Sequence, residues 1–153
     1  MNALILWLGQ GLGSGRIKPA PGTWGTLAGA LIWWAIEPAL SFEVEVAAVI
    51  LASIIGIYFC GRSAEILNVH DDGSIVWDEF AGIWLTYLML QPGDNLWLWV
   101  LGFILFRLFD ILKPWPIRWI DRSVQGGFGI MLDDVIAGLM AGAVGLLFIF
   151  TVM

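Results

Sequence analysis

Charged residues, cysteine and histidine are all scarce in this 153-residue chain. Only 13% of its residues are charged, about half the share in an average soluble domain, whereas 59% are hydrophobic. Lys and Arg number seven against thirteen Asp and Glu, which excludes the cationic surface of a nucleic-acid-binding domain. The single cysteine, Cys60, cannot form an internal disulfide. Because the hydrophobic content also excludes a disordered chain, the composition indicates a small integral membrane protein.

Five uncharged apolar stretches follow one another along the chain, at residues 23–36, 46–61, 80–90, 96–106 and 135–152. A full span takes about 20 residues, so the second stretch with its flanks and the fifth are long enough to cross a membrane. The third and fourth must recruit flanking residues, which include Asp78, Glu79 and Asp110. Because charges at membrane depth are tolerated where they line a protein cavity or pair with one another, the short stretches indicate a polar site. We expect an all-α, polytopic membrane helical bundle of about four to five spans, in one membrane-embedded domain over residues 1–153.

Charge is distributed unevenly between the two sides of such a bundle. In the five-span arrangement all seven Lys and Arg residues lie on one side, because the connections at residues 37–45 and 91–95 contain none. The positive-inside bias makes this side cytoplasmic. Nine of the thirteen acidic residues lie there as well. Since a topology signal alone needs no acids, we expect the polar loops to form an active site at the cytoplasmic face.

A glycine-rich segment, GLGSG at residues 11–15, precedes a second one, PAPGTWGT at residues 19–26. Glycines let the backbone approach a ligand, and a helix that begins near Thr23 would direct free N–H groups toward an anion such as phosphate. Ser14, Thr23 and Thr26 supply hydroxyl groups at the same place. The spacing fits neither a P-loop nor a dinucleotide-binding fingerprint. A tight turn with a capped entry into a span is the alternative interpretation.

The segment HDDGSIVWDE, residues 70–79, combines the only histidine with two pairs of adjacent acids. Asp78 and Glu79 lie at the edge of an apolar stretch, where unpaired carboxylates need a cation or become protonated. A cluster of hard oxygen ligands suits Mg²⁺ better than zinc. An acid pair favoured by the dipole at a helix N-terminus is the alternative. His70 is either a general acid or a polar residue at the membrane interface.

Four of the seven basic residues lie in the segment FRLFDILKPWPIRWIDR, residues 106–122. Arg107 and Asp110 are three residues apart, so a structural ion pair on a helix is one explanation for them. Arg107, Lys113 and Arg118 also carry the positive charge that a lipid phosphate attracts. The alternative is that these basic side chains extend to lipid phosphates in general and have no catalytic role.

A second acid pair, Asp133 and Asp134, follows the glycine-rich segment at residues 126–129 and precedes the last apolar stretch. We expect a loop over these glycines and a helix that the two acids begin. Two acid pairs, Asp110 and several cations then gather on one face of the membrane. Carboxylates around Mg²⁺ with Arg or Lys nearby are the usual machinery of phosphoryl chemistry.

These segments resemble, in the same order, the signature blocks of the phosphatidylglycerophosphatase A family. The blocks are GSGRIKPAPGTWGT, HDDGSIVWDEFAG, FRLFDILKPWPIRWIDR and GGFGIMLDDVIAG. The resemblance implies a Mg²⁺-dependent phosphatase of the bacterial inner membrane that converts phosphatidylglycerophosphate to phosphatidylglycerol, with a phospholipid substrate and the lipid bilayer as its partners. The residues at the polar positions of these blocks are Asp78, Glu79, Asp110, Lys113, Asp133 and Asp134.

We hypothesise a role for each polar residue of the four segments. The Mg²⁺ ligands are Asp78, Glu79, Asp133 and Asp134. The ion binds the terminal phosphate and activates the water that attacks it. The catalytic groups are Asp78, Glu79, Asp110, Asp134 and His70. The substrate-binding groups are Arg107, Lys113, Arg118, Thr23, Thr26 and Ser14.

Three other phosphatase chemistries do not fit the sequence. The cysteine-based one needs Cys-x5-Arg, but the sixth residue after Cys60 is Ile66. A phosphohistidine mechanism needs a second histidine, and an aspartyl-phosphate enzyme of the haloacid dehalogenase type needs Asp-x-Asp; the chain has neither. A carboxylate nucleophile in place of water stays open.

Two alternatives from other classes also stay open. A CDP-alcohol phosphotransferase-like phospholipid enzyme uses acids at the same face, but its Asp-Gly-x-x-Ala-Arg block is not matched after Asp72 and Gly73. A small metal or ion transporter predicts polar residues at several membrane depths, whereas the acids here gather on one side.

Overall fold

The computed structural model describes residues 1–152, and over that range it contains helices and connecting loops but no strand. Its seven α-helices and two short 3-10 segments are α1 (Asn2–Gly9), η1 (Gly11–Arg16), α2 (Pro21–Ile36), η2 (Glu37–Ala39), α3 (Phe42–Leu67), α4 (Trp77–Leu90), α5 (Leu96–Leu112), α6 (Ile117–Ser123) and α7 (Gly126–Val152). The predicted all-α class is confirmed for the described part of the chain. Pro21 begins α2, and proline is tolerated there because the N–H groups of the first turn have no hydrogen-bond acceptor within the helix. Pro114 follows the end of α5.

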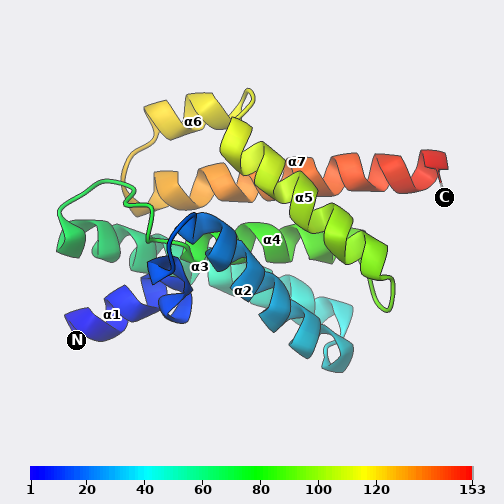
Figure 1. Cartoon of the computed structure of the whole chain (residues 1–153), viewed down its shortest axis with the longest axis horizontal. Coiled ribbons are helices and arrows are strands. Elements are labelled where there is room, and N and C mark those ends of the chain that lie inside the picture. The colour runs from blue at the N-terminus through cyan, green and yellow to red at the C-terminus, as the bar shows by residue number, and fades with distance from the viewer. Residues whose placement is uncertain (153) are drawn as a thin grey trace.

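Helix α4 lies at the centre of the bundle. It packs against α2, α3, α5 and α7, which surround it in Figure 1. Phe80, Ile83 and Tyr87 on α4 are almost fully buried, and the Tyr87 hydroxyl donates a hydrogen bond to the Trp99 carbonyl over 3.0 Å. Because four helices enclose α4, the two acidic residues in its first turn are held inside the protein.

The close approach of α4 and α7 depends on two glycines. A Cβ atom on Gly138 would lie 2.4 Å from the Gly82 carbonyl oxygen, and one on Gly82 would lie 2.8 Å from the Asp134 carbonyl oxygen. A side chain at either position would therefore push the helices apart. Small residues at helix–helix contacts are typical of membrane proteins, because lipid gives helices no hydrophobic reason to associate. The two glycines bring α4 next to the acidic segment of α7.

Two helices are long and apolar enough to cross a membrane. α3 has 26 residues and contains an 18-residue window with a mean hydropathy of 2.2, and α7 has 27 residues and contains such a window with a mean hydropathy of 2.4. These two helices support association with a membrane. α2, α4 and α5 have 16, 14 and 17 residues, fewer than the roughly 20 of a full span. Any span beyond α3 and α7 therefore stays a prediction that depends on residues flanking the shorter helices.

Helix α7 begins earlier than the sequence indicates. The glycine-rich segment at residues 126–129, expected as a loop, forms the first turn of the helix. Gly127 serves helix packing, since a Cβ atom at this position would lie 2.0 Å from the Ile57 carbonyl oxygen of α3. Asp133 and Asp134 therefore lie about two turns inside α7. A dipole at the helix N-terminus does not explain this acid pair, because that effect is confined to the first turn.

Candidate active site

A polar cavity of about 240 Å³ lies where four helices meet at one end of the bundle. It is formed by the first turns of α2 and α4, the end of α5, the first half of α7 and the loop before α4. The lining residues are Pro21, Gly22, Asp71, Gly73, Ile75, Asp78, Glu79, Asp110, Lys113, Asp133 and Asp134. The fold thus brings together the two acid pairs, Asp110 and one lysine that the sequence predicts for the site.

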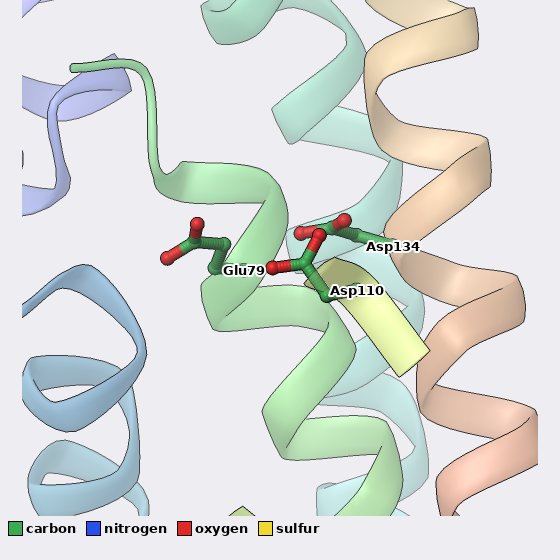
Figure 2. A group of neighbouring side chains, drawn as sticks. All are labelled: Glu79, Asp110 and Asp134. Carbon is green, nitrogen blue, oxygen red and sulfur yellow. The ribbon is translucent and has the colours of Figure 1, made fainter. Parts of the chain in front are cut away.

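Three of these carboxylates form a compact group. One oxygen from each of Glu79, Asp110 and Asp134 lies within 4.8 Å of the other two. Figure 2 shows the three side chains on α4, α5 and α7, with the carboxylates of Asp110 and Asp134 facing each other. Glu79 and Asp134 are only 9% and 3% exposed. The geometry therefore groups Asp110 with two of the predicted metal ligands.

The oxygen atoms around this group fit a divalent cation. Asp134 Oδ2 and Asp78 Oδ1 are buried and lack a hydrogen-bond partner. A buried carboxylate oxygen without a partner is costly, and a bound cation removes that cost. Several carboxylate oxygens in one place are the donor set that hard cations such as Mg²⁺ bind. The residues present therefore satisfy the chemical requirement for a metal site.

Arg107 connects three helices at the edge of the cavity. Its Nη1 lies 3.2 Å from Glu79 Oε1 and 3.2 Å from Thr26 Oγ1. It also forms the ion pair with Asp110 that the sequence spacing predicts. Thr26 donates a hydrogen bond to Glu79 Oε2 over 3.0 Å. The ion pair between Arg107 and Asp110 is therefore part of the site, and not a separate bridge on the protein surface.

Gly22 touches this ion-pair network with its backbone. A Cβ atom at this position would lie 2.5 Å from Glu79 Oε1 and 3.1 Å from a terminal nitrogen of Arg107. Only glycine leaves room for both groups. The sequence indicates a close backbone approach in the segment that contains Gly22, but the groups being approached come from α4 and α5 and could not be named from the sequence.

Lys113 provides the second cation of the cavity. Its Nζ lies 2.6 Å from Asp121 Oδ1 and 2.7 Å from Asp133 Oδ2. Partial burial disfavours the charged ammonium, but the two carboxylates outweigh this effect and raise the pKa of Lys113 above its usual value. Lys113 is therefore a cation at neutral pH. Asp121, which the sequence does not single out, binds the lysine together with Asp133.

The loop before α4 forms one wall of the cavity, and the first glycine motif supports it from behind. A Cβ atom on Gly15 would lie 2.1 Å from the Ser74 carbonyl oxygen. Gln10 Nε2 donates a hydrogen bond to Ser74 Oγ over 2.8 Å. The N–H groups of Gly13 and Gly15 both donate to the Gln10 carbonyl over 3.0 Å. The motif therefore positions the loop, and these two N–H groups are already bonded within the chain.

Of the three predicted hydroxyl ligands, Thr26 alone bonds to an acid of the site. Gly22 and Thr26 are four residues apart on α2, so they share the face that meets Glu79. Thr23 lies on another face of this first turn and does not line the cavity. Ser14 Oγ donates to the Gly11 carbonyl over 2.7 Å, within its own turn.

His70 and Arg118 lie outside the cavity lining. His70 Nε2 accepts a hydrogen bond from the Gly126 N–H over 3.0 Å, which joins the loop before α4 to the start of α7. Arg118 lies in a separate surface depression with Trp115 and Trp119. After the turn at the end of α5, α6 lies alongside α7 in Figure 1. The two residues therefore do not contact the carboxylate group in this arrangement.

The apolar helices and the cavity of carboxylates and cations define a membrane-associated protein with a site suited to a divalent cation and a phosphate group. Residues 7–149 match the family described as Phosphatidylglycerophosphatase A. The chain belongs to this family of phosphatases, which confirms the predicted membership.

Two relatives carry the same name as the family. Phosphatidylglycerophosphatase A of Escherichia coli K12 is 47% identical over 138 residues, which cover 90% of this chain and 78% of the relative. Phosphatidylglycerophosphatase A of Haemophilus influenzae is 46% identical over 135 residues, with 88% and 82% covered. A relative from Bacteroides thetaiotaomicron, provisionally named a phosphatidylinositol-3-phosphatase, is 36% identical over 142 residues, with 89% and 87% covered. No solved structure matches the chain.

Proposed function

We propose that this protein removes the terminal phosphate of phosphatidylglycerophosphate and leaves phosphatidylglycerol and inorganic phosphate. The names of the relatives at 47% and 46% identity support this substrate. The observation that carries the proposal is the group of Glu79, Asp110 and Asp134, with Arg107 in contact with two of its members. Enzymes that transfer or hydrolyse phosphoryl groups commonly combine carboxylates that bind a divalent cation with a guanidinium that binds phosphate oxygens.

Mg²⁺ is the ion that we assign to this carboxylate group. Its ligands are Glu79, Asp110 and Asp134, with Asp78 beside them. When bound, the ion supplies positive charge against the phosphate oxygens and lowers the pKa of a water molecule. Asp133 lines the same cavity and forms an ion pair with Lys113. Its role in this proposal is to position the Lys113 ammonium group.

Arg107 and Lys113 neutralise the phosphate as the bond between phosphorus and the glycerol oxygen breaks. Charge that develops on the reacting oxygens is best stabilised by groups that are already in place. Glu79 and Thr26 hold Arg107 before any substrate arrives. Asp78 Oδ1, which is buried and unpartnered, accepts the proton of the attacking water. The water oxygen becomes part of the inorganic phosphate, and the leaving glycerol oxygen takes up the proton that Asp78 accepted and becomes a hydroxyl.

The site faces the cytoplasm at the bacterial inner membrane in this proposal, in a bundle of about four to five spans. The charges at the two ends of the bundle support this orientation. Lys113 lines the cavity and Arg107 pairs with two of its acids, whereas the opposite end has a hollow lined by Glu37 and Asp94. The positive-inside bias places the cationic end in the cytoplasm. The short helices cross by recruiting flanking residues or by local thinning of the bilayer.

Phosphate release by the purified protein in detergent tests the proposal. Phosphatidylglycerophosphate, phosphatidic acid and phosphatidylinositol 3-phosphate serve as substrates, the last because of the name of the Bacteroides relative. We expect the fastest release from phosphatidylglycerophosphate. Faster release from one of the other two lipids would overturn the substrate assignment. Folded, monodisperse protein that releases phosphate from none of them would favour the phosphotransferase or transporter alternatives.

Asparagine variants test the residue assignments in the same assay. We expect Asp78→Asn and Asp134→Asn to lower phosphate release by about 100-fold, because each removes an ionisable oxygen from the site. Asp94→Asn is the matched control, since Asp94 is exposed in the loop before α5, at the opposite end of the bundle. The metal-site assignment would be wrong if both site variants kept near-normal release at saturating Mg²⁺.

A further inference from the structure

An apolar groove of about 390 Å³ runs between α2 and α5, with α4 as its floor. Figure 1 shows α2 and α5 beside each other across α4. Leu31 and Trp34 line the α2 side, Val100 and Phe103 line the α5 side, and Tyr87 belongs to the floor. The Tyr87 hydroxyl is bonded to a backbone carbonyl of α5. The groove therefore presents hydrocarbon surface to whatever occupies it.

The walls of the groove are large side chains that the protein leaves uncovered. Leu31 is 56% exposed, Trp34 59% and Val100 42%. Contiguous apolar surface of this kind indicates an apolar ligand or partner. Around a membrane-associated bundle, the apolar molecules at hand are lipids. We therefore expect the ligand of the groove to be a lipid acyl chain.

One end of the groove lies next to the ion-pair network of the site. Leu27 lines the groove directly after Thr26, and Phe103 lines it four residues before Arg107. Residues four apart on a helix lie one above the other, so Arg107 is the next group along the same face of α5. Thr26 and Arg107 contact each other over 3.2 Å and both bond to Glu79. The apolar groove thus begins where the ion-pair network of the site ends.

The other end of the groove leads to a hollow whose charged lining residues are both carboxylates. Trp34 lines both the groove and a neighbouring hollow that contains Glu37 and Asp94. No Lys or Arg stands among the lining residues of that hollow, so its carboxylates repel a phosphate group. At the first end, Arg107, Lys113 and the Mg²⁺ of the proposed function offset the acids of the cavity and attract one. A molecule with an apolar body and a phosphate head therefore fits the groove in one direction only, with its head at the polar cavity.

We infer that the groove binds an acyl chain of the same lipid whose terminal phosphate occupies the polar cavity. The inference rests on the proposed function and extends it, because it names a binding site for the part of the substrate that does not react. The α2 wall from Leu27 to Trp34 contacts about 10 Å of the chain. This contact gives binding energy that a water-soluble phosphate ester lacks, so the groove selects lipid substrates and orients them.

Groove-filling variants test the inference. Leu31→Trp and Val100→Trp each replace an aliphatic side chain with a large indole ring at the place where the acyl chain would lie. Leu51→Trp on α3 and Val144→Trp on α7 are matched controls, because Leu51 is 56% exposed and Val144 is 41% exposed and neither lines the groove. We expect the groove variants to lower kcat/KM for dioleoyl phosphatidylglycerophosphate by about tenfold relative to the controls, the loss expected when two methylene groups are no longer buried.

The deacylated headgroup has no acyl chain, so its hydrolysis shows whether a groove variant affects the reaction itself. We expect its kcat/KM to be the same in the groove variants and in the controls. Equal losses on the lipid and on the deacylated headgroup, or no difference between groove and control variants on the lipid, would overturn the inference.

A binding measurement keeps the test independent of turnover. Phosphatidylglycerophosphate with a photoreactive diazirine in one acyl chain is irradiated with the wild-type protein, and the labelled peptides are identified by mass spectrometry. We expect adducts on residues 27–34 and 96–103, which Leu31→Trp reduces. Adducts spread evenly over α3 and α7 would overturn the inference. Adducts in the groove from a protein that releases no phosphate would support the groove and contradict the proposed reaction.

Discussion

Arg107 on α5 forms an ion pair with Glu79 on α4, with 3.2 Å between Nη1 and Oε1. The two side chains are 14% and 11% exposed. Because both charges are largely removed from water, each depends on the other for compensation. Thr26 of α2 contacts the same guanidinium nitrogen. The pair therefore contributes both to the packing of α5 against α4 and to the geometry of the proposed active site.

Arg107→Ala is expected to reduce the free energy of unfolding by roughly 3–5 kcal/mol, because it leaves the carboxylates of Glu79 and Asp110 without their cation. Thermal unfolding in detergent, followed by circular dichroism, measures the change. Arg62→Ala is the control, since Arg62 pairs with Glu65 on the surface and its side chain is 42% exposed. A surface pair contributes less than about 1 kcal/mol. Similar losses in the two variants would contradict the importance of the pair in the site.

Asp110→Asn is expected to raise the Mg²⁺ concentration needed for half-maximal phosphate release by about 10- to 100-fold, since one carboxylate of the three is lost. A magnesium titration of the initial rate measures this shift. Asp94→Asn is the control, because Asp94 is exposed and lies at the opposite end of the bundle. An unchanged titration curve for Asp110→Asn would exclude Asp110 from the ligand set.

Gly138→Ala tests the contact that places α7 against α4. The added Cβ atom would lie 2.4 Å from the Gly82 carbonyl oxygen, so the helices must separate. Overpacking of this kind costs about 1–3 kcal/mol. Gly73→Ala is the control, because the nearest atom to its added Cβ lies 3.9 Å away. A melting temperature of Gly138→Ala equal to that of the control would show that the helices tolerate a wider spacing.

Asp72 predicts a pH dependence of stability. Its Oδ1 accepts hydrogen bonds from the N–H and the hydroxyl of Ser74, over 2.9 and 2.6 Å, and these bonds lower its pKa. A carboxyl whose pKa is lower in the folded state stabilises the fold above the ordinary aspartate pKa, and this contribution is lost as the pH falls through the folded-state pKa.

The melting temperatures of wild-type protein and Asp72→Asn, measured at a series of pH values, check this sign. We expect wild type to be the more stable near neutral pH and the difference to shrink below about pH 4. A difference that grows on acidification would contradict the assignment of the lowered pKa to the bonds with Ser74.

The sequence predicts which segments form the site, because acids and cations beside apolar stretches have few stable places in a membrane protein. It does not predict how neighbouring acids divide their contacts. Asp133 and Asp134 look like one pair in the sequence, but successive residues on a helix point about 100° apart. Asp134 therefore faces Asp110, whereas Asp133 meets Lys113.

The glycine segment at residues 126–129 likewise has a conformation that the sequence alone does not predict. Glycines at residues 126–129 are compatible with a loop or with a tight helix contact, and the difference depends on Ile57, which lies on another helix. Packing also decides which basic side chain contacts the acids of the site. Arg107 and Arg118 are equally basic, but Arg107 lies on the face of α5 that meets Glu79 of α4, and Arg118 lies on α6 beside exposed tryptophans.

The most direct test of the account is phosphate release from phosphatidylglycerophosphate by the purified protein, with Mg²⁺ and with a chelator, beside Asp134→Asn. The account predicts release that saturates with Mg²⁺ and stops in the chelator. It also predicts that Asp134→Asn, shown to be folded by circular dichroism, loses this release. Release that continues in the chelator, or that proceeds at the wild-type rate in Asp134→Asn, would contradict the carboxylate site as the centre of the reaction.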